Sequence, residues 1–447
     1  MSFPRYPKYK DSGVEWLGEV PEHWGVKPLK TVASHNDDVL PEDTPPDYEI
    51  NYVDISGVEA GAGITTRETM PFSAAPSRAR RKVQHGDVIV STVRTYLRAI
   101  ARIVEPESNL VVSTGFAAIR PREALCAGFA GYMLSGNHFI EQVIARSTGV
   151  SYPAINASEL VGIPALLPPP KEQAAIATFL DRETAKIDAL IAEQQRLIEL
   201  LQEKRQAVIS HVVTKGLNPD APMKDSGIEW LGEVPEHWQV IPLKRLADIQ
   251  TGVAKGKDNS GKATISVPYL RVANVQDGYL DLNEVTTIDI PADELPRYSL
   301  RAGDVLMNEG GDFDKLGRGC IWEGQLDPCI TQNHVFAVRP RCVSAQWLNA
   351  ITGSGYAQFY FMSRSKQSTN LASISSTNLM ELPVILPPNE EQSGVLSFMA
   401  TQTSLFTSLT AKATQAIALL QERRSALISA AVTGQIDVRG LAGSEAA

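Results

Sequence analysis

Two kinds of hydrophobic pattern alternate along this chain and predict its secondary structure. The first consists of short segments rich in Val, Ile and Thr and bounded by Gly, Pro or Asn, which is typical of β-strands. Examples are GDVIVSTV from Gly86, VVSTGFAAI from Val111, ISVPYLRV from Ile265 and HVFAVRP from His334. The second pattern is long and has helical spacing. We therefore expect an α/β (α+β) fold in which a domain with a mixed, curved β-sheet precedes each of two long helices.

The first long helix is predicted to begin after Pro168-Pro169-Pro170, because proline fits the first helical turn but not the helix interior. Its apolar stripe consists of Ile176, Leu180, Ile187, Leu190, Ile191, Leu197, Leu201, Val208 and Val212. The second helix has Val395, Met399, Phe406, Leu409, Ala416, Leu420, Leu427 and Ala431 in the corresponding places. About 40 helical residues span about 60 Å, which exceeds the width of such a domain. We therefore expect the helices to pair as an antiparallel coiled coil; the alternative is that each packs on its own domain.

These patterns occur twice because the chain contains an internal repeat, a feature that decides the architecture of a protein wherever it occurs. Residues 11–30 read DSGVEWLGEVPEHWGVKPLK, residues 225–244 read DSGIEWLGEVPEHWQVIPLK, and 17 of these 20 positions are identical at an offset of 214. The repeat continues at GDVIVS from Gly86 and GDVLMN from Gly303, at an offset of 217. From Ile119 onward the offset is 219, through IRPR and VRPR, the PP-x-x-EQ segments, and LLQEKRQAVIS and LLQERRSALIS.

The repeat defines the predicted domain boundaries. They are a first sheet-containing domain at 1–168, a central helix at 169–216, a second sheet-containing domain at 217–387, a C-terminal helix at 388–436 and a tail at 437–447. The frames of the two copies match closely, but their interiors differ: STVRTYLRAIARI shares little with NEGGDFDKLGRGCIW. This unevenness suggests one task performed on two different targets, whereas the alternative is a duplication that drifted.

Composition and charge narrow the class of protein. The chain has 447 residues and a formal net charge of -9, which argues against a generally basic nucleic-acid coat protein but is compatible with a local basic face. Cys126, Cys320, Cys329 and Cys342 form no CxxC pair, so neither a zinc site nor a disulfide framework is expected. The opening MSFPRYPKYKDSG has no apolar segment of the kind found in signal peptides, and no apolar run approaches the length of a membrane span. We expect a reduced, cytoplasmic protein.

The WLGEVPEHW box, the GDV turn and the PP-x-x-EQ-x-x-(I/V) start of the helix, each present twice in the same order, resemble the specificity subunit of type I restriction–modification systems. The resemblance implies that the domains at 1–168 and 217–387 are target-recognition domains, each of which reads one half of a split, non-palindromic DNA site, and that the helices act as a spacer. It also implies that the chain docks two methyltransferase subunits, which two restriction–translocase subunits can join. Catalysis, S-adenosylmethionine, ATP and Mg²⁺ would then belong to those partners. One departure is that ATQTSLFTSLTAKATQ in the second helix lacks the charges of DRETAKIDALIAEQQR in the first.

Other motifs are weaker. Gly256 to Lys262 nearly forms a phosphate-binding P-loop, but Ala263 stands where a hydroxyl is needed, and TISVPYLRV reads as a strand where a helix should follow. We interpret this segment as a basic loop that contacts DNA phosphates through Lys255, Lys257 and Lys262, or as an ordinary solvated loop. No NPPY-type methyltransferase tetrapeptide is present. A self-contained modification enzyme and a DNA-mimic or scaffold protein are the rival functions, and interspersed charges argue against the mimic.

Candidate DNA contacts follow from side-chain chemistry, since Arg, Lys and small polar groups bind phosphates while Arg, Asn and Gln read bases. In the first domain, Thr92, Arg94, Tyr96 and Arg98 alternate along a predicted strand and should share one face. A basic run and an exposed polar loop complete that set: Arg78, Arg80, Arg81, Lys82, Arg146, Ser147 and Tyr152. In the second domain the candidates are Asn308, Glu309, Asp312, Lys315, Arg318, Gln332, Asn333, His334, Arg364, Lys366, Gln367 and Ser368. We expect Trp16, Trp24, Trp230 and Trp238 to form a structural latch between box and domain.

Overall fold

A computed structural model describes residues 3–256, 261–311, 313, 316–317, 319–367 and 372–441. The chain forms two compact units: unit 1 is Met1–Gln195 with Thr414–Ala447, and unit 2 is Arg196–Ala413. Each unit therefore combines one sheet-based domain with part of each long helix. No helix in the described parts of the chain is both long enough and apolar enough to cross a membrane.

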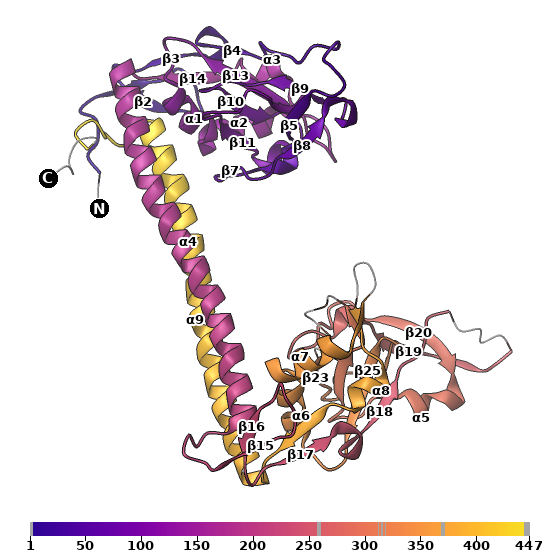
Figure 1. Cartoon of the computed structure of the whole chain (residues 1–447). Coiled ribbons are helices and arrows are strands. Elements are labelled where there is room, and N and C mark those ends of the chain that lie inside the picture. Colours follow the sequence, from indigo (N-terminus) through magenta and orange to yellow (C-terminus); the bar gives the residue numbers. More distant parts are fainter. Residues whose placement is uncertain are drawn as a thin grey trace. The chain divides into compact units, whose positions relative to one another are not determined.

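Unit 1 contains an antiparallel four-stranded sheet with the order β11-β10-β13-β4 and a second four-stranded sheet with the order β8-β5-β12-β9 (Figure 1). The second sheet is mixed, because β12 pairs in parallel with β5 and antiparallel with β9. The strands are β4 Ala33–His35, β5 Glu49–Val53, β8 Glu68–Pro71, β9 Ala79–Lys82, β10 Val88–Ser91, β11 Ile100–Arg102, β12 Leu110–Ser113 and β13 Phe116–Pro121. The mixed sheet that the sequence predicts is therefore present.

Short elements complete unit 1. They are β1 Tyr9–Asp11, β2 Glu19–Pro21, β3 Gly25–Pro28, β6 Val58–Glu59, β7 Gly63–Ile64, β14 Pro164–Leu167, α1 Ala127–Ser135, α2 Asn137–Arg146 and α3 Ala157–Leu160. The predicted strand VVSTGFAAI is two strands, β12 and β13, which belong to different sheets. The chain passes between them at Gly115, where a Cβ atom would lie 2.7 Å from Ile55 Cδ1. Only glycine fits this crossing without displacing the Ile55 side chain.

Unit 2 repeats the strand order of the first sheet as β23-β21-β25-β18, again antiparallel, and adds the sheets β20-β19-β24 and β22-β27-β26. Its strands are β15 Met223–Asp225, β16 Glu233–Pro235, β17 Gln239–Pro242, β18 Ala247–Thr251, β19 Thr264–Leu270, β20 Thr286–Pro291, β21 Val305–Asn308, β22 Gly310–Gly311, β23 Gly319–Ile321, β24 Ile330–Thr331, β25 Val335–Pro340, β26 Lys366–Gln367, β27 Ala372–Ser373 and β28 Pro383–Leu386. Its short helices are α5 Leu295–Tyr298, α6 Ala345–Thr352, α7 Gly355–Arg364 and α8 Ser376–Met380. The predicted strand after the P-loop-like segment is confirmed as β19.

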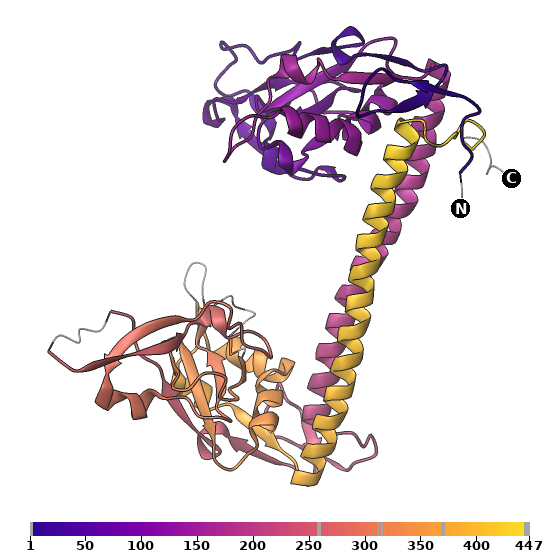
Figure 2. The same cartoon turned by 180° about the vertical axis from the view of Figure 1, so that it is seen from behind.

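The long helices are α4, Pro170–Lys215, and α9, Asn389–Val432. In unit 1 the first part of α4 and the last part of α9 lie side by side (Figures 1 and 2), and Leu180 of α4 shares a buried core with Val432 of α9. In unit 2, Val212 of α4 shares a core with Val395 of α9. In both units these residues also pack against the sheet-based domain, so each helix segment has a domain and a helix as neighbours. Pairing as one continuous antiparallel spacer stays a prediction.

The predicted apolar stripe is only partly buried. Ile176 and Leu180 are fully buried, but Leu190 is 45% exposed, Leu197 is 42% exposed and Leu409 is 38% exposed. The expectation of a continuously buried stripe is therefore wrong at these positions. One partner helix buries a narrower part of a helix surface than a whole domain does. Apolar residues at the margins of the stripe therefore stay in solvent where only the other helix covers them.

Candidate nucleic-acid interface

The residues that the two copies share are engaged in buried framework contacts. In unit 1, Arg120 donates from Nε to Asp87 Oδ1 at 2.9 Å and from its terminal nitrogen to Asp87 Oδ2 at 2.9 Å. In unit 2, Arg339 makes the same bidentate contact with Asp304 at 2.7 Å twice. Both aspartates are 1% exposed, and hydrogen bonding to them raises the pKa of each arginine. The shared GDV and (I/V)RPR motifs therefore form one structural pair that joins two neighbouring strands.

The glycine of the GDV turn belongs to the same framework. Gly86 has a φ angle of 90° and Gly303 a φ angle of 93°, a backbone region that disfavours other residues. The backbone N–H of Gln84 donates to Asp87 in unit 1, and that of Arg301 donates to Asp304 in unit 2. The same turn therefore begins β10 and β21.

The tryptophan latch connects the WLGEVPEHW box to the start of each long helix. Trp24 is fully buried and donates from Nε1 to Glu172 Oε1 at 2.9 Å, and His23 contacts the other oxygen of that carboxylate at 2.8 Å. In unit 2, Trp238 donates to Glu391 at 2.8 Å. These contacts account for the shared glutamate of the PP-x-x-EQ segments. The structural role that we predict for Trp24 and Trp238 is therefore confirmed.

The other two box tryptophans lie nearer the surface. Trp16 packs on the edge of the core and stacks against the ring of His138, with ring centroids 6.2 Å apart. Trp230 is 40% exposed, and its ring lies 6.2 Å from that of Phe359. Both side chains pack on helices of their own unit.

Beyond the framework, the chain diverges where β10 ends in unit 1. The prediction that Thr92, Arg94, Tyr96 and Arg98 alternate along one strand is wrong, because β10 stops at Ser91 and a 3-10 turn occupies Thr95–Leu97. Arg94 and Arg98 have φ angles of 51° and 53°, so the backbone is left-handed on both sides of this turn. The Ser91 hydroxyl donates to the Val93 carbonyl oxygen at 2.6 Å and competes with strand pairing.

A second loop is fastened to this turn. The Ile155 N–H donates to the Thr92 carbonyl oxygen at 2.9 Å, and the Thr95 and Ser147 hydroxyls lie 2.8 Å apart. At the surface, the Arg94 guanidinium lies 4.7 Å above the Tyr152 ring. The structure therefore brings together candidates that are more than 50 positions apart in the sequence. Thr92 and Ser147 hold the backbone, whereas Arg94 and Tyr152 face solvent.

The basic run of unit 1 is divided among several roles. Arg78 forms an ion pair with Asp54 at 2.7 Å, and its hydrogen bond to Tyr52 raises its pKa. Arg80 lies over the Phe72 ring, and Arg81 is half-buried, so burial lowers its pKa. Lys82, Tyr96, Arg98 and Arg146 are exposed, and Arg98 donates to the Asn137 side-chain oxygen at 3.3 Å. The residues of this unit with the greatest freedom to contact a ligand therefore lie in the 92–98 turn and beside it.

Unit 2 has the same backbone arrangement with different side chains. Glu309, which aligns with Thr92, receives the N–H of Ile374 on its carbonyl oxygen, and its own N–H donates to the His334 carbonyl oxygen; both distances are 2.9 Å. The Glu309 carboxylate contacts His334 Nδ1 at 2.8 Å, and Asn333 lies 3.2 Å from His334 Nε2. Asn308 is 8% exposed and its amide donates to the Val275 carbonyl oxygen, so its contact is internal.

The remaining candidates of unit 2 surround this cluster or lie apart from it. Lys366 and Gln367 form the exposed strand β26, which pairs with β27, and β27 pairs with β22 beside Glu309. Arg364 is exposed and Gln332 is half-buried. Lys255 is exposed, and Lys262 lies 3.7 Å from Glu294. The candidates Lys257, Asp312, Lys315, Arg318 and Ser368 lie outside the described residues.

The set of candidates chosen from the sequence leaves out some exposed apolar residues of the unit 1 loops. Val150 is 102% exposed and Leu97 is 43% exposed, and both flank the Arg94–Tyr152 pair in the sequence. Large apolar side chains next to polar loop residues carry no periodic signal that marks them as surface. Their one clue was position, since both lie where the two copies differ.

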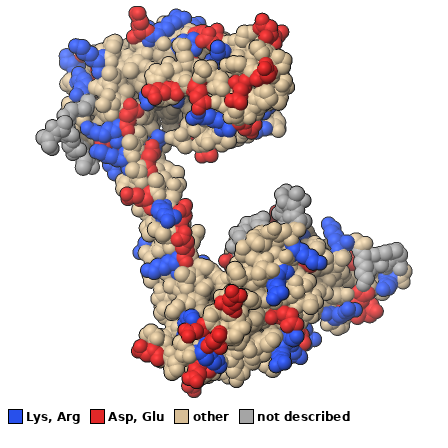
Figure 3. Space-filling model, in the orientation of Figure 1, with Lys and Arg blue, Asp and Glu red and all other residues tan. Residues whose placement is uncertain are grey.

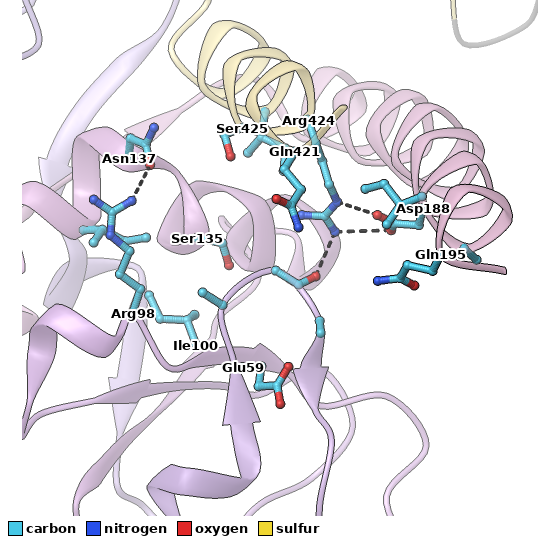
Figure 4. Close-up of a pocket in the computed structure, with 17 residues that line it drawn as sticks. Glu59, Arg98, Ile100, Ser135, Asn137, Asp188, Gln195, Gln421, Arg424 and Ser425 are labelled. Atoms are coloured by element: carbon cyan, nitrogen blue, oxygen red, sulfur yellow. Dashed lines mark hydrogen bonds and ion pairs between the residues drawn. The ribbon is translucent and has the colours of Figure 1, made fainter. Parts of the chain in front are cut away.

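Charge and surface shape complete the description. Lys and Arg side chains are interspersed with Asp and Glu side chains over the visible face (Figure 3). Within the described residues, no group of three or more His, Cys, Asp or Glu is placed to hold a metal ion. In unit 1 a cleft lies between the β6–β7 hairpin, α2 and the long helices (Figure 4). Arg424 of α9 crosses it, bonding Asp188 of α4 at 2.9 Å and the Gly61 carbonyl oxygen at 3.0 Å.

Known proteins resemble the chain along most of its length, although no family model matches it. The type I restriction enzyme EcoKI specificity subunit of Escherichia coli (strain K12) is 21% identical over 441 residues, covering 94% of this chain and 90% of that protein. The StySPI specificity subunit of Salmonella potsdam is 21% identical over 398 residues, covering 85% and 82%. The chain is similar in sequence to the specificity subunits of type I restriction enzymes. This similarity agrees with the resemblance of the WLGEVPEHW, GDV and PP-x-x-EQ motifs.

Comparison of folds gives the same relationship. A chain from a structure that describes complex assembly and conformational transition of the type I R-M system matches with a TM-score of 0.68 and 21% identity. The match covers 92% of this chain and 98% of that chain. The fold that the two chains share therefore extends over most of both units.

Proposed function

We propose that this chain is the DNA sequence-recognition subunit of a type I restriction–modification complex and that it reads a bipartite, non-palindromic site. One observation carries the proposal. Thr92 and Glu309 occupy the same place in two equivalent backbone frameworks, each bonded to the strand beside it and to the loop before the next short helix. The framework is shared, while the side chains it presents differ in charge and shape. Two unlike reading surfaces suit two unlike half-sites.

The same reasoning extends to partners and catalysis. We propose that two methyltransferase subunits dock on this chain, that restriction–translocase subunits join them, and that the long helices space the half-sites. S-adenosylmethionine, ATP and Mg²⁺ would bind those partners, and this chain would position DNA. The relatives are named as subunits of restriction enzymes, which supports this division of labour.

Methylation-aware sequencing of cells that carry the chain with its methyltransferase subunits tests the proposal. A split motif is expected, with two short specific parts separated by unspecified bases. Replacing residues 31–160 with the equivalent region of another such subunit should change one part and leave the other. A swap that alters both parts in an assembled complex would refute the assignment of one half-site to each domain.

A second test addresses catalysis. The purified chain alone is expected to show no methyl transfer, nuclease or ATPase activity, and adding the methyltransferase subunits should restore methylation of DNA. Activity that stays with the chain through stringent purification would instead favour the rival interpretation, a self-contained modification enzyme.

A further inference from the structure

Arg94 differs from the other basic candidates of unit 1 in how it is held. Its backbone is left-handed, with a φ angle of 51°, a conformation that costs energy for a residue other than glycine. Its guanidinium lies 4.7 Å over the Tyr152 ring, which comes from a separate loop. Strained backbone persists where the surrounding structure enforces it and tends to lie at functional sites. Arg94 is therefore held in place by contacts that leave it exposed.

The donors of Arg94 remain available. Within the described residues, the structure shows no hydrogen bond or ion pair from the Arg94 side chain, whereas Arg78 is paired with Asp54 and Arg98 with Asn137. Stacking uses the face of a guanidinium and leaves the N–H groups at its edge. Tyr152, which is 64% exposed, therefore orients the guanidinium and leaves its N–H groups available.

We propose that Arg94, oriented by Tyr152, reads a guanine in the half-site of the first domain; this inference rests on the proposed function. An arginine fork matches the two acceptors O6 and N7 that guanine presents in the major groove. A phosphate could bind a lysine ammonium as well as an arginine guanidinium. A guanine favours arginine, because the fixed planar guanidinium can donate to both of its acceptors at once. Unit 2 presents no arginine at the matching place, because Arg94 aligns with Gly311, so this guanine contact belongs to the first half-site alone.

The experiment measures the methylated motif in cells carrying the full chain with its methyltransferase subunits. The variants are Arg94→Lys, Arg94→Ala, Tyr152→Ala and Tyr152→Phe. Arg122→Lys is the matched control, because Arg122 is an exposed arginine of the same domain at the opposite end of β13. Arg94→Lys keeps the positive charge but removes the fork, and Tyr152→Phe keeps the ring.

We expect the wild-type motif to contain a guanine in one half whose preference falls roughly 5- to 150-fold in Arg94→Lys and Arg94→Ala, which corresponds to the loss of one bidentate base contact. Tyr152→Ala should reduce that preference and Tyr152→Phe should keep it, while the other half and the control stay unchanged. An unchanged motif in both Arg94 variants would overturn the inference and leave the proposed function standing.

Other outcomes are equally decisive. Uniformly weaker methylation at all sites, without a change of base preference, would make Arg94 a phosphate contact and overturn the inference. Loss of the folded complex in Arg94→Lys, seen by circular dichroism, would make the residue structural and also overturn it. A wild-type chain that yields no split motif would overturn both the inference and the proposed function, before any variant is compared.

Discussion

At the scale of single residues, the buried pair of Asp87 and Arg120 joins the GDV turn to the neighbouring strand. Replacing Asp87 with Asn removes the bidentate partner of the Arg120 guanidinium, which keeps its ion pairs with Asp38 at 2.7 Å and Asp37 at 3.8 Å. Because the guanidinium keeps a counter-charge, we expect the loss to stay at about 1–3 kcal/mol, below that of a buried charge left unpaired. We expect the free energy of unfolding of Asp87→Asn to fall by that amount in chemical denaturation.

The matched control for this prediction is Lys8→Ala. Lys8 and Glu22 form an ion pair at 3.9 Å, with both side chains more than half exposed. Exposed ion pairs contribute about 0–1 kcal/mol, so the free energy of unfolding of this variant should be close to that of the wild type. Equal losses in the two variants would show that burial of Asp87 does not decide the strength of its pair.

His138 gives unit 1 a dependence on pH. Burial lowers the pKa of His138 from 6.5 to about 4, and its ring stacks on Trp16. A histidine whose pKa is lower in the folded state stabilises the protein fully above pH 6.5, and this stability is lost as pH falls from 6.5 toward 4. We expect wild-type protein to lose about 1–3 kcal/mol more than His138→Phe over this range.

Unfolding by urea at pH 7 and pH 5 would measure this difference, because the phenylalanine keeps a stacked ring but cannot be protonated. Parallel pH profiles for wild type and His138→Phe would show that the pKa of His138 is the same in the folded and unfolded protein, contrary to the lowered pKa.

At the scale of elements, the β6–β7 hairpin is tied to the long helices through one arginine. Arg424 aligns with Arg205 at an offset of 219, but Asp188 aligns with Thr407, and the described residues show no ion pair for Arg205. We expect Arg424→Ala to increase hydrogen exchange in residues 58–64, because a helix contact of that hairpin is lost. The effect on global stability should be small, about 1 kcal/mol, since the ion pair is partly exposed.

Arg205→Ala is the internal control for this prediction, as it removes the same side chain from the equivalent position. No change of exchange is expected in unit 2. If exchange at 58–64 is the same in Arg424→Ala and wild type, the hairpin is held by its own turn and not by the helix.

At the scale of the whole molecule, the proposed spacer role can be tested by changing helix length. Inserting four residues near Gln194 adds about one helical turn and about 6 Å, and it keeps the apolar stripe nearly in phase. Since B-DNA rises about 3.4 Å per base pair, the methylated motif should lengthen its spacer by nearly two pairs.

A two-residue insertion at the same place provides the contrast. It would rotate the stripe by about 200° and expose it, so we expect assembly to fail and methylation to be lost. If the four-residue variant instead methylates the original motif with its spacer unchanged, the length of the helices does not set the distance between the half-sites.

The sequence by itself determined the features that come from local pattern and from comparison of the two copies. Short Val- and Ile-rich segments became strands, and the positions after Pro170 and Pro388 became long helices, because periodicity and proline act over a few residues. Trp24 and Trp238 could be recognised as structural because both copies contain them. The relationship to the specificity subunits was visible for the same reason.

Only the tertiary structure decided how residues distant in the sequence come together. The turn at 92–98 looked like a strand, but β10 ends at Ser91, and the Thr92 carbonyl oxygen accepts the N–H of Ile155 from a distant loop. The same packing places Arg94 on Tyr152, a contact that no spacing rule predicts. It also leaves Leu190 and Leu197 exposed, because the width of a buried stripe depends on what covers the helix and not on the helix alone.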